Sequence, residues 1–157
     1  MIKRELYMNR IRPFIGGELI KVMTGIRRSG KSVMLELIKE ELAEAGVAPS
    51  QMISINFEDM RYSHLQTATA LHDEIIKRAE GIEGKAYLFF DEIQEVEGWE
   101  KCVNSLRVAL DCDIYITGSN AKLLSGELAT YIGGRYVEFV IYPFSFAEFL
   151  ELYHTIA

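Results

Sequence analysis

Hydrophobic residues along the chain follow two patterns, the short apolar runs of strands and the three-to-four spacing of helices. The short runs predict five strands, at 19–25, 51–57, 86–90, 113–117 and 136–141. Apolar residues at helical spacing predict helices at 1–12, 31–45, 68–80, 99–110 and 121–131, and from Ser145 onward. Strands that alternate with helices over the whole length indicate an α/β fold, a mostly parallel sheet with helices on both faces.

The segment after the first predicted strand carries the clearest chemical motif. It reads GIRRSGKS over 25–32, a complete G-x4-G-K-S match between an apolar strand and an amphipathic helix. Glycines let such a loop wrap closely around phosphate oxygens, and the helix N-terminus adds a positive dipole. The lysine reaches the β- and γ-phosphates, and the serine hydroxyl is a ligand for Mg²⁺. The nucleotide-binding residues that the motif predicts are Gly25, Ile26, Arg27, Arg28, Ser29, Gly30, Lys31, Ser32 and Val33.

Two acidic residues, Asp91 and Glu92, end the apolar run at 86–90. Buried carboxylates are costly unless something engages them, so this position favours a functional role. Asp91 is expected to hold Mg²⁺ together with Ser32, and Glu92 to orient and deprotonate the water that attacks the γ-phosphate. The sequence therefore predicts catalytic roles for Lys31 and Glu92, and metal binding by Ser32 and Asp91.

Polar residues also end two other predicted strands. Ser119 and Asn120 follow the run at 113–117. Either can aim a hydrogen bond at the γ-phosphate or the attacking water, and either can cap the next helix. Asn56, near the end of the second predicted strand, is either a turn residue or a group that holds Glu92 away from the water.

Composition limits the classes to which this chain can belong. Its 157 residues, 49% hydrophobic and 25% charged, suit a single domain, here 1–157, with a core of its own. The chain has two cysteines, too few for a disulfide framework or a four-ligand metal site. Cys102 is on the apolar side of a predicted helix, and Cys112 is in a predicted acidic loop. Without a signal peptide or an apolar run of roughly 20 residues, the sequence predicts a cytoplasmic domain with no membrane contact.

Charge is unevenly distributed within the net value of −6. Residues 1–31 hold eight Lys/Arg and two Glu, a balance of +6, whereas residues 32–157 hold nine against twenty-one, a balance of −12. The basic N-terminal region is either a solvated surface or a face for an anion. A nucleic-acid contact would have to be local, and its candidate residues are Arg4, Arg10, Arg12 and Lys21.

The motifs GIRRSGKS, INFED, LFFDEIQ, DIYITGSNAKLLSGELATYIGGRY and YPFSFAEF, in this order, resemble the AAA-type ATP-binding proteins of bacteria and archaea. The resemblance runs from about residue 2 to residue 152 and implies a three-layer P-loop NTPase fold with a sheet ordered 5-1-4-3-2. It implies that ATP–Mg²⁺ binds to Lys31 and Ser32 with Asp91 on the metal, Glu92 as catalytic base, and Ser119 or Asn120 as sensor. Family members are much longer, so we interpret the chain as an N-terminal ATPase domain or a short relative, without lid or C-terminal domain.

Arg135 is a candidate source of positive charge for phosphoryl transfer. It follows Gly133-Gly134 and precedes the last predicted strand, which the resemblance sets beside the first. A parallel fifth strand would start at the sheet edge opposite the phosphates. A contact from Arg135 into a neighbouring copy is therefore favoured over one within the chain, and a solvated arginine is the alternative. Arg27 and Arg28 face the phosphates, a neighbouring chain or solvent.

The leading functional hypothesis is an ATPase whose hydrolysis drives a conformational change. The alternative is a nucleotide-gated binding module, in which ATP occupancy recruits a partner with little turnover. The expected partners are ATP and ADP, with self-association or an unidentified protein; net acidity argues against nucleic acid as the main partner. A GTPase is not favoured because no N-K-x-D motif occurs, and a small-molecule kinase would need an acceptor site.

Overall fold

A computed structural model describes residues 4–26, 29–119, 123 and 133–143 of the chain. Within them, five strands form one parallel sheet in the order β2-β3-β4-β1-β5. The strands are β1 Ile20–Thr24, β2 Met52–Asn56, β3 Ala86–Asp91, β4 Cys112–Gly118 and β5 Tyr136–Val140. Read from the other edge this is the order 5-1-4-3-2, so the predicted fold class and strand order are confirmed.

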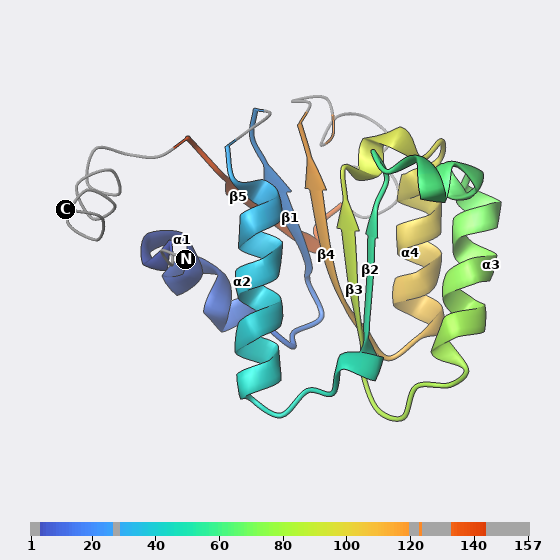
Figure 1. Ribbon diagram of the computed structural model, residues 1–157, viewed down its shortest axis with the longest axis horizontal. Helices are drawn as coiled ribbons and strands as arrows, with labels where there is room; N and C mark the ends of the chain where they lie inside the picture. The colour runs from blue at the N-terminus through green and yellow to red at the C-terminus, as the bar shows by residue number, and fades with distance from the viewer. Residues whose placement is uncertain (1–3, 27–28, 120–122, 124–132, 144–157) are drawn as a thin grey trace.

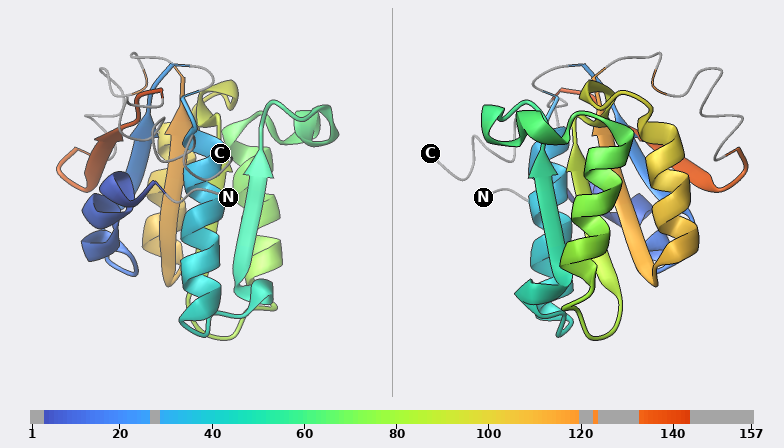
Figure 2. Two further views of the ribbon diagram at one scale, coloured as in Figure 1. Left: turned by 60° about the vertical axis from the view of Figure 1, so that its left-hand side comes forward. Right: turned by 90° about the vertical axis from the view of Figure 1, so that its right-hand side faces the viewer.

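Helices cover both faces of the sheet and give the molecule three layers (Figures 1 and 2). They are α1 Glu5–Ile11, α2 Lys31–Glu44, α3 Ala68–Ala79 and α4 Trp99–Ala109. Short 3-10 helices are η1 Arg12–Phe14, η2 Pro49–Gln51, η3 Met60–Leu65 and η4 Ile93–Glu95. The helices α1 and α2 pack on one face of the sheet, and α3 and α4 on the other.

The side chains of β3 and β4 alternate between these two faces, as the repeat of two residues in a strand requires. Phe89 and Tyr115 point toward α1 and α2, with their rings stacked 4.9 Å apart. Leu88 and Ile116 point toward α3 and α4. All four are fully buried, so the two continuous apolar runs form central strands covered on both sides.

Lys21 of β1 lies inside the core as part of a buried polar group. Its Nζ donates to the Gly17 carbonyl at 2.9 Å and forms an ion pair with Asp113. The other carboxylate oxygen of Asp113 accepts from the Gly16 N–H at 2.8 Å and from the Tyr115 hydroxyl at 2.6 Å. Burial lowers the pKa of Lys21, and Asp113 opposes that shift. Lys21, one of the candidates considered for a local nucleic-acid contact, is therefore excluded from that role, because its ammonium is enclosed by the protein.

One further expectation is corrected. Cys112 does not lie in an acidic loop but begins β4, where it is half-buried and pairs with Ala86 of β3. The helices predicted at 121–131 and from Ser145 fall outside the described residues, apart from Leu123. In the part of the chain that the structure describes, no helix is long and apolar enough to cross a membrane.

Candidate functional site

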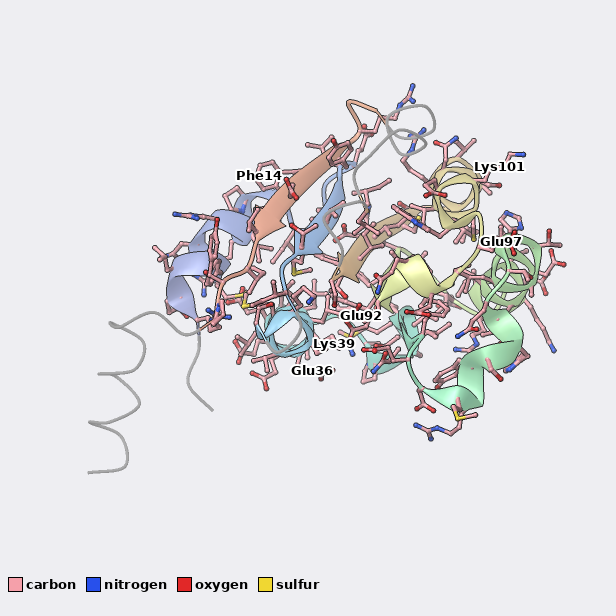
Figure 3. All side chains as sticks on the ribbon, turned by 90° about the horizontal axis from the view of Figure 1, so that it is seen from above. Phe14, Glu36, Lys39, Glu92, Glu97 and Lys101 are labelled. Atoms are coloured by element: carbon pink, nitrogen blue, oxygen red, sulfur yellow. The ribbon has the colours of Figure 1, made fainter. Side chains whose placement is uncertain are left out.

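The carboxyl ends of β1, β3 and β4 lie at one edge of the sheet and bring three distant segments together. There β1 ends at Thr24 and α2 begins at Lys31, while Asp91, Glu92 and Ser119 lie at the ends of β3 and β4. Figure 3 looks down on this edge and labels Glu92. Open parallel sheets bind their ligands at this edge. The predicted motifs therefore converge where a ligand is expected.

Lys31, the first residue of α2, is folded back onto the loop that precedes it. Its Nζ donates to the carbonyl oxygens of Gly25 at 2.8 Å and Ile26 at 3.1 Å. Gly30, immediately before it, has φ of 97°, a left-handed conformation that favours glycine and lets the loop turn into the helix. The ammonium is thus held by the backbone of its own loop.

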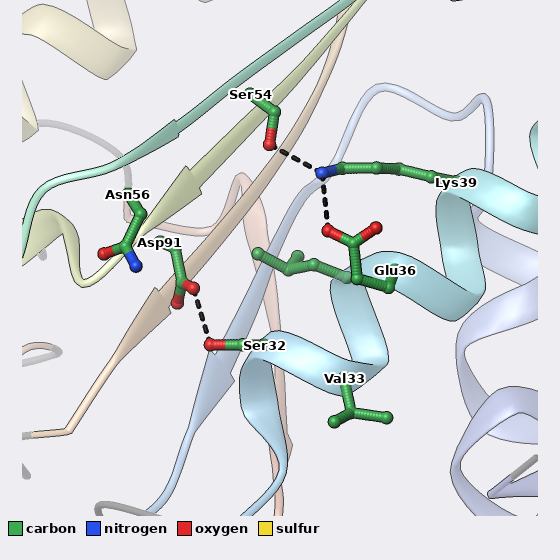
Figure 4. Close-up of a pocket in the computed structure, with 8 residues that line it drawn as sticks. Ser32, Val33, Glu36, Lys39, Ser54, Asn56 and Asp91 are labelled. Carbon is green, nitrogen blue, oxygen red and sulfur yellow. Dashed lines mark hydrogen bonds and ion pairs between the residues drawn. The ribbon is translucent and has the colours of Figure 1, made fainter. Parts of the chain in front are cut away.

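Ser32 and Asp91, the predicted metal ligands, are in direct contact. The Ser32 Oγ donates to Oδ2 of Asp91 at 2.6 Å (Figure 4), and the Thr117 Oγ1 donates to Oδ1 at 2.5 Å. Carboxylate and hydroxyl oxygens are the donors that Mg²⁺ prefers, so this pair fits the ion. Among the described residues, no three or more His, Cys, Asp or Glu side chains gather into a metal site. An ion held by Ser32 and Asp91 would therefore complete its ligands with phosphate and water.

A cavity of about 300 Å³ opens beside this pair, between α2 and β2 (Figure 4). Ser32 and Asp91 line one part of it. Lys39 lines another part, where its Nζ donates to the Ser54 Oγ at 2.6 Å and to Glu36 at 2.9 Å. The cavity leaves the Ser32–Asp91 pair accessible from the side of the edge strand.

Glu92 has a backbone conformation that is rare for a residue with a side chain. Its φ of 58° and ψ of 52° lie in the left-handed region, which costs about 1–3 kcal/mol outside glycine and is concentrated at functional sites. The Glu92 N–H donates to the Thr117 Oγ1 at 2.9 Å, and this hydroxyl donates in turn to Asp91. Thr117 therefore holds both acidic residues in place.

The carboxylate of Glu92 contacts three side chains. The Ser119 Oγ lies 2.6 Å and 2.8 Å from its two oxygens, and the Gln94 Nε2 donates to Oε2 at 2.5 Å. The Lys31 Nζ lies 3.6 Å from Oε1 and 3.2 Å from the Ser119 Oγ. Burial raises the pKa of Glu92, but the hydrogen bonds and the ammonium lower it by more, so it lies below its usual value. Lys31, Ser119 and Glu92, predicted from separate motifs, form one contiguous group.

Asn56 has the simpler of the two roles considered for it. Its Oδ1 accepts the Glu58 N–H at 3.0 Å, which stabilises the turn after β2. The described partners of the Glu92 carboxylate are instead Ser119, Gln94 and Lys31. The structure therefore supports the turn residue and not the group that restrains Glu92.

Arg135 lies at the opposite end of the strands, where β1 and β5 begin. Its carbonyl oxygen accepts the Ile20 N–H at 2.9 Å, at the amino end of β1, and β5 then runs parallel to β1. Five residues of strand at about 3.3 Å each separate its backbone from the loop after β1 by roughly 16 Å. Within one chain the structure does not bring Arg135 to the group of Lys31, Ser119 and Glu92.

The remaining predicted residues fall into two groups. Arg27, Arg28 and Asn120 lie outside the described residues. Ile26 and Val33 are exposed near the loop, whereas Ser29 is buried and its hydroxyl makes no hydrogen bond to a described group.

Two side chains at this edge, Gln94 and Arg4, were not predicted, nor was the contact of Thr117 with Asp91. Gln94 and Thr117 are polar residues next to predicted motifs, and that proximity is the signal that could have identified them. Arg4 donates through Nη1 to the Ser29 carbonyl at 2.6 Å. Nothing in its local sequence marks this contact, because the partner lies 25 positions away.

Comparison with known proteins finds a matching family, similar sequences and similar solved structures. The profile of the family described as AAA domain matches residues 17–150. An uncharacterised protein of Haemophilus influenzae is 48% identical over 151 residues, which are 96% of this chain and 38% of that protein. The chain thus spans less than half the length of this relative.

Two solved structures share the fold at low sequence identity. The Orc1 protein of Aeropyrum pernix, in complex with DNA, has a TM-score of 0.67 and 15% identity over 99% of this chain and 49% of that chain. AMPPCP-bound DnaA from Aquifex aeolicus has a TM-score of 0.58 and 13% identity over 90% of this chain and 48% of that chain. Likeness at this level concerns the arrangement of helices and strands.

Proposed function

The chain belongs to the AAA domain family, and on that premise we propose that it binds ATP with Mg²⁺ at the carboxyl edge of its sheet and hydrolyses it. The observation that carries the proposal is the contact group of Lys31, Ser119 and Glu92 beside the Ser32–Asp91 pair. These residues come from separate segments. Together they supply what phosphoryl transfer needs: positive charge, a general base and metal-binding oxygens.

ATP binding uses the loop at 25–32 in this proposal. Backbone N–H groups of the loop and the N-terminus of α2 face the phosphates. Lys31 exchanges its two carbonyl partners for the β- and γ-phosphates, because a hydrogen bond to a charged acceptor is stronger than one to a neutral carbonyl. The loop residues that border the nucleotide are Ile26, Arg27, Arg28 and Val33. The DnaA neighbour carries AMPPCP, an ATP analogue, which supports this choice of ligand.

Ser32 and Asp91 hold Mg²⁺ in this proposal, Asp91 directly or through a water. The bound ion supplies positive charge that neutralises the phosphate oxygens. The 2.6 Å contact between Ser32 and Asp91 supports the assignment, because two oxygen donors are already side by side at the end of the loop.

Glu92 is the proposed general base. It takes a proton from the water whose oxygen attacks the γ-phosphorus, while the bond from that phosphorus to the β–γ bridging oxygen breaks to give ADP and inorganic phosphate. A pKa below its usual value keeps the carboxylate ionised and able to accept the proton. Ser119 and Gln94 orient this carboxylate, and Ser119 or Asn120 senses the γ-phosphate.

A second copy of the chain completes the site through Arg135 in this proposal. Arg135 lies at the amino edge of the sheet, away from the loop of its own chain. Self-association that sets this edge against the carboxyl edge of another copy would bring a guanidinium to the transferring phosphate.

A nucleotide-gated binding module is the second candidate. The observation in its favour is that protein groups hold both Lys31 and Glu92 in the described structure. Nucleotide binding would break these contacts and rearrange the edge of the sheet without turnover. In both candidates the change at this end of the sheet is transmitted to a partner or to other parts of the protein.

DNA contact is not part of either candidate, although the Orc1 neighbour is in complex with DNA. Three of the four basic residues considered for it are engaged within the chain. Arg4 donates to Ser29, Arg12 to Glu41 and Lys21 to Asp113.

The deciding experiment measures ATP binding and phosphate release by the chain and by its Glu92→Gln variant. We expect the variant to bind ATP but to lose turnover by roughly 100-fold or more, the usual contribution of a general base. Glu95→Gln is the matched control, because Glu95 is an exposed glutamate in η4, the short helix that directly follows Glu92. Binding without turnover in the unaltered chain would favour the nucleotide-gated module, and absence of binding would reject both candidates.

A further inference from the structure

The side chain of Arg4 lies between the phosphate loop and the chain that leaves β5. It is only 4% exposed and directly precedes α1, which packs beside α2 and β5 (Figure 1). Its Nη1 donates to the Ser29 carbonyl at 2.6 Å, and its Nη2 donates to the Tyr142 carbonyl at 2.7 Å. One guanidinium therefore joins two segments that are far apart in the sequence.

The backbone of Tyr142 is held through both of its polar groups. Its carbonyl accepts from Arg4, and its N–H donates to the Tyr7 hydroxyl at 3.1 Å. The Arg4 guanidinium also lies over the Tyr7 ring, 4.5 Å from its centroid, where a cation–π interaction is favourable. Arg4 and Tyr7 therefore act together on the backbone of Tyr142, one on its carbonyl and the other on its N–H.

The phosphate loop has no spare room against these partners. A Cβ atom on Gly25 would lie 2.3 Å from the Ile141 carbonyl oxygen, and one on Gly30 would lie 2.7 Å from the Arg4 Nη1. The glycines at both ends of the loop are thus in close contact with Ile141 and Arg4. A shift of the backbone at Gly25 or Gly30 would therefore act on these contacts.

We propose that Arg4 is a positioning residue that couples nucleotide occupancy of the phosphate loop to the chain leaving β5 at Tyr142. The proposal rests on the proposed function, because nucleotide is the ligand that moves the loop. Coupling of this kind is reciprocal. If bound nucleotide changes the equilibrium constant for holding Tyr142 by some factor, loss of the Arg4 link changes the affinity for nucleotide by the same factor. Arg4 needs no contact with the nucleotide for this role.

The first experiment follows amide hydrogen exchange without nucleotide, in peptides that cover 25–32 and 138–143. Arg4→Met should speed exchange in both peptides, because it removes both carbonyl contacts. Arg10→Met is the matched control on α1 and should leave both unchanged, since Arg10 is exposed. Tyr7→Phe, which removes a single hydroxyl and is mild enough to keep the fold, should speed exchange only at 138–143. Unchanged exchange in folded Arg4→Met would overturn the link.

The second experiment adds saturating ATP with Mg²⁺. In the unaltered chain we expect slower exchange in both peptides. In Arg4→Met we expect about 10-fold weaker binding, equivalent to about 1.4 kcal/mol, and slower exchange only at 25–32. Arg4→Lys should resemble Arg4→Met at 138–143, because an ammonium lacks the planar fork that reaches two carbonyls at once.

The outcomes separate this inference from the proposed function. An exchange response at 138–143 that persists in Arg4→Met at saturation would overturn the coupling while leaving ATP binding intact. Absence of binding in the unaltered chain would overturn the proposed function, and the coupling with it. A purely structural Arg4 would lower thermal stability but leave the affinity and the response at 138–143 unchanged.

Discussion

The hydroxyl of Ser119 donates to the carboxylate of Glu92, with its oxygen 2.6 Å from Oε1 and 2.8 Å from Oε2. The two residues are 27 positions apart and meet because β3 and β4 are neighbours in the sheet. The Lys31 Nζ lies 3.2 Å from the same hydroxyl. A phosphate that draws Lys31 away therefore changes the surroundings of the proposed general base.

The two acidic residues at the end of β3 should differ in their response to substitution. Asp91→Asn should raise the Mg²⁺ concentration needed for ATP binding by roughly 10-fold, because it removes a carboxylate from the proposed metal site. Glu92→Gln should leave that requirement unchanged. Titration of ATP binding against Mg²⁺ measures both. An equal effect in the two variants would make Glu92 a metal ligand or a purely structural residue.

ATP with Mg²⁺ should raise the melting temperature, and Lys31→Ala should abolish most of the rise. A ligand that binds only the folded chain stabilises it by about 2.7 kcal/mol at 100 times its Kd. The variant loses the ammonium that faces the phosphates. Lys77→Ala, an exposed lysine on α3, is the control and should keep the full shift. A melting temperature that ATP does not move in the unaltered chain would contradict the nucleotide site.

Arg135→Ala should leave the ATP affinity of a monomeric sample nearly unchanged but lower the turnover of an assembled one. The turnover rate should fall by roughly 10³-fold, the lower end of the range for an arginine that stabilises a transferring phosphoryl group. Mixing Arg135→Ala with Lys31→Ala is the sharper measurement, because the Lys31→Ala chain still has its arginine. Recovery of turnover in the mixture would establish a contact between copies. A large loss of affinity in the monomer would instead require Arg135 to act within its own chain.

Asp113→Ala should lower the free energy of unfolding by about 3–5 kcal/mol, because it leaves the buried ammonium of Lys21 without its partner. Tyr115→Phe removes one hydrogen bond to the same carboxylate and should cost about 1 kcal/mol. Urea unfolding measures both. Similar stabilities for the two variants would mean that the ion pair contributes little to the fold.

The two cysteines should make the fold less stable at alkaline pH. Burial raises the pKa of Cys102 to about 12, and burial together with Asp113 raises that of Cys112 to about 11. The folded chain then keeps protons that the unfolded chain loses near pH 9, so the free energy of unfolding falls as the pH rises from about 9 to 12. Urea unfolding at several pH values checks the slope. Cys102→Ala should flatten it, and an unchanged slope would contradict this account.

The places of the loop after β1 and of the acidic pair could be predicted because each motif is contiguous. The loop joins a strand and a helix that their own apolar residues reveal, and Asp91 and Glu92 follow an apolar run that reveals β3. The strand order followed from the family resemblance and is confirmed. That order determines where Ser119 and Arg135 lie relative to the loop.

Contacts that depend on long-range packing could not be predicted. The sequence shows that Lys21 interrupts an apolar strand, but it does not show whether the side chain of Lys21 points to solvent or into the core. Nor does it indicate that Asp113 will form an ion pair with Lys21 inside the core. Asn56 has the same difficulty, because a turn residue and a restraint on Glu92 look identical until the side chains are located. Arg4 was considered only as surface charge, since its partners lie on two other segments.

The bonds from Lys31 to the carbonyls of Gly25 and Ile26 have a consequence for affinity. The loop competes with the incoming nucleotide for its own ammonium, so the nucleotide binds less tightly than the contact between ammonium and phosphate alone would allow. Side-chain rearrangements of this kind take picoseconds to nanoseconds, so the competition lowers the affinity for nucleotide without slowing its association.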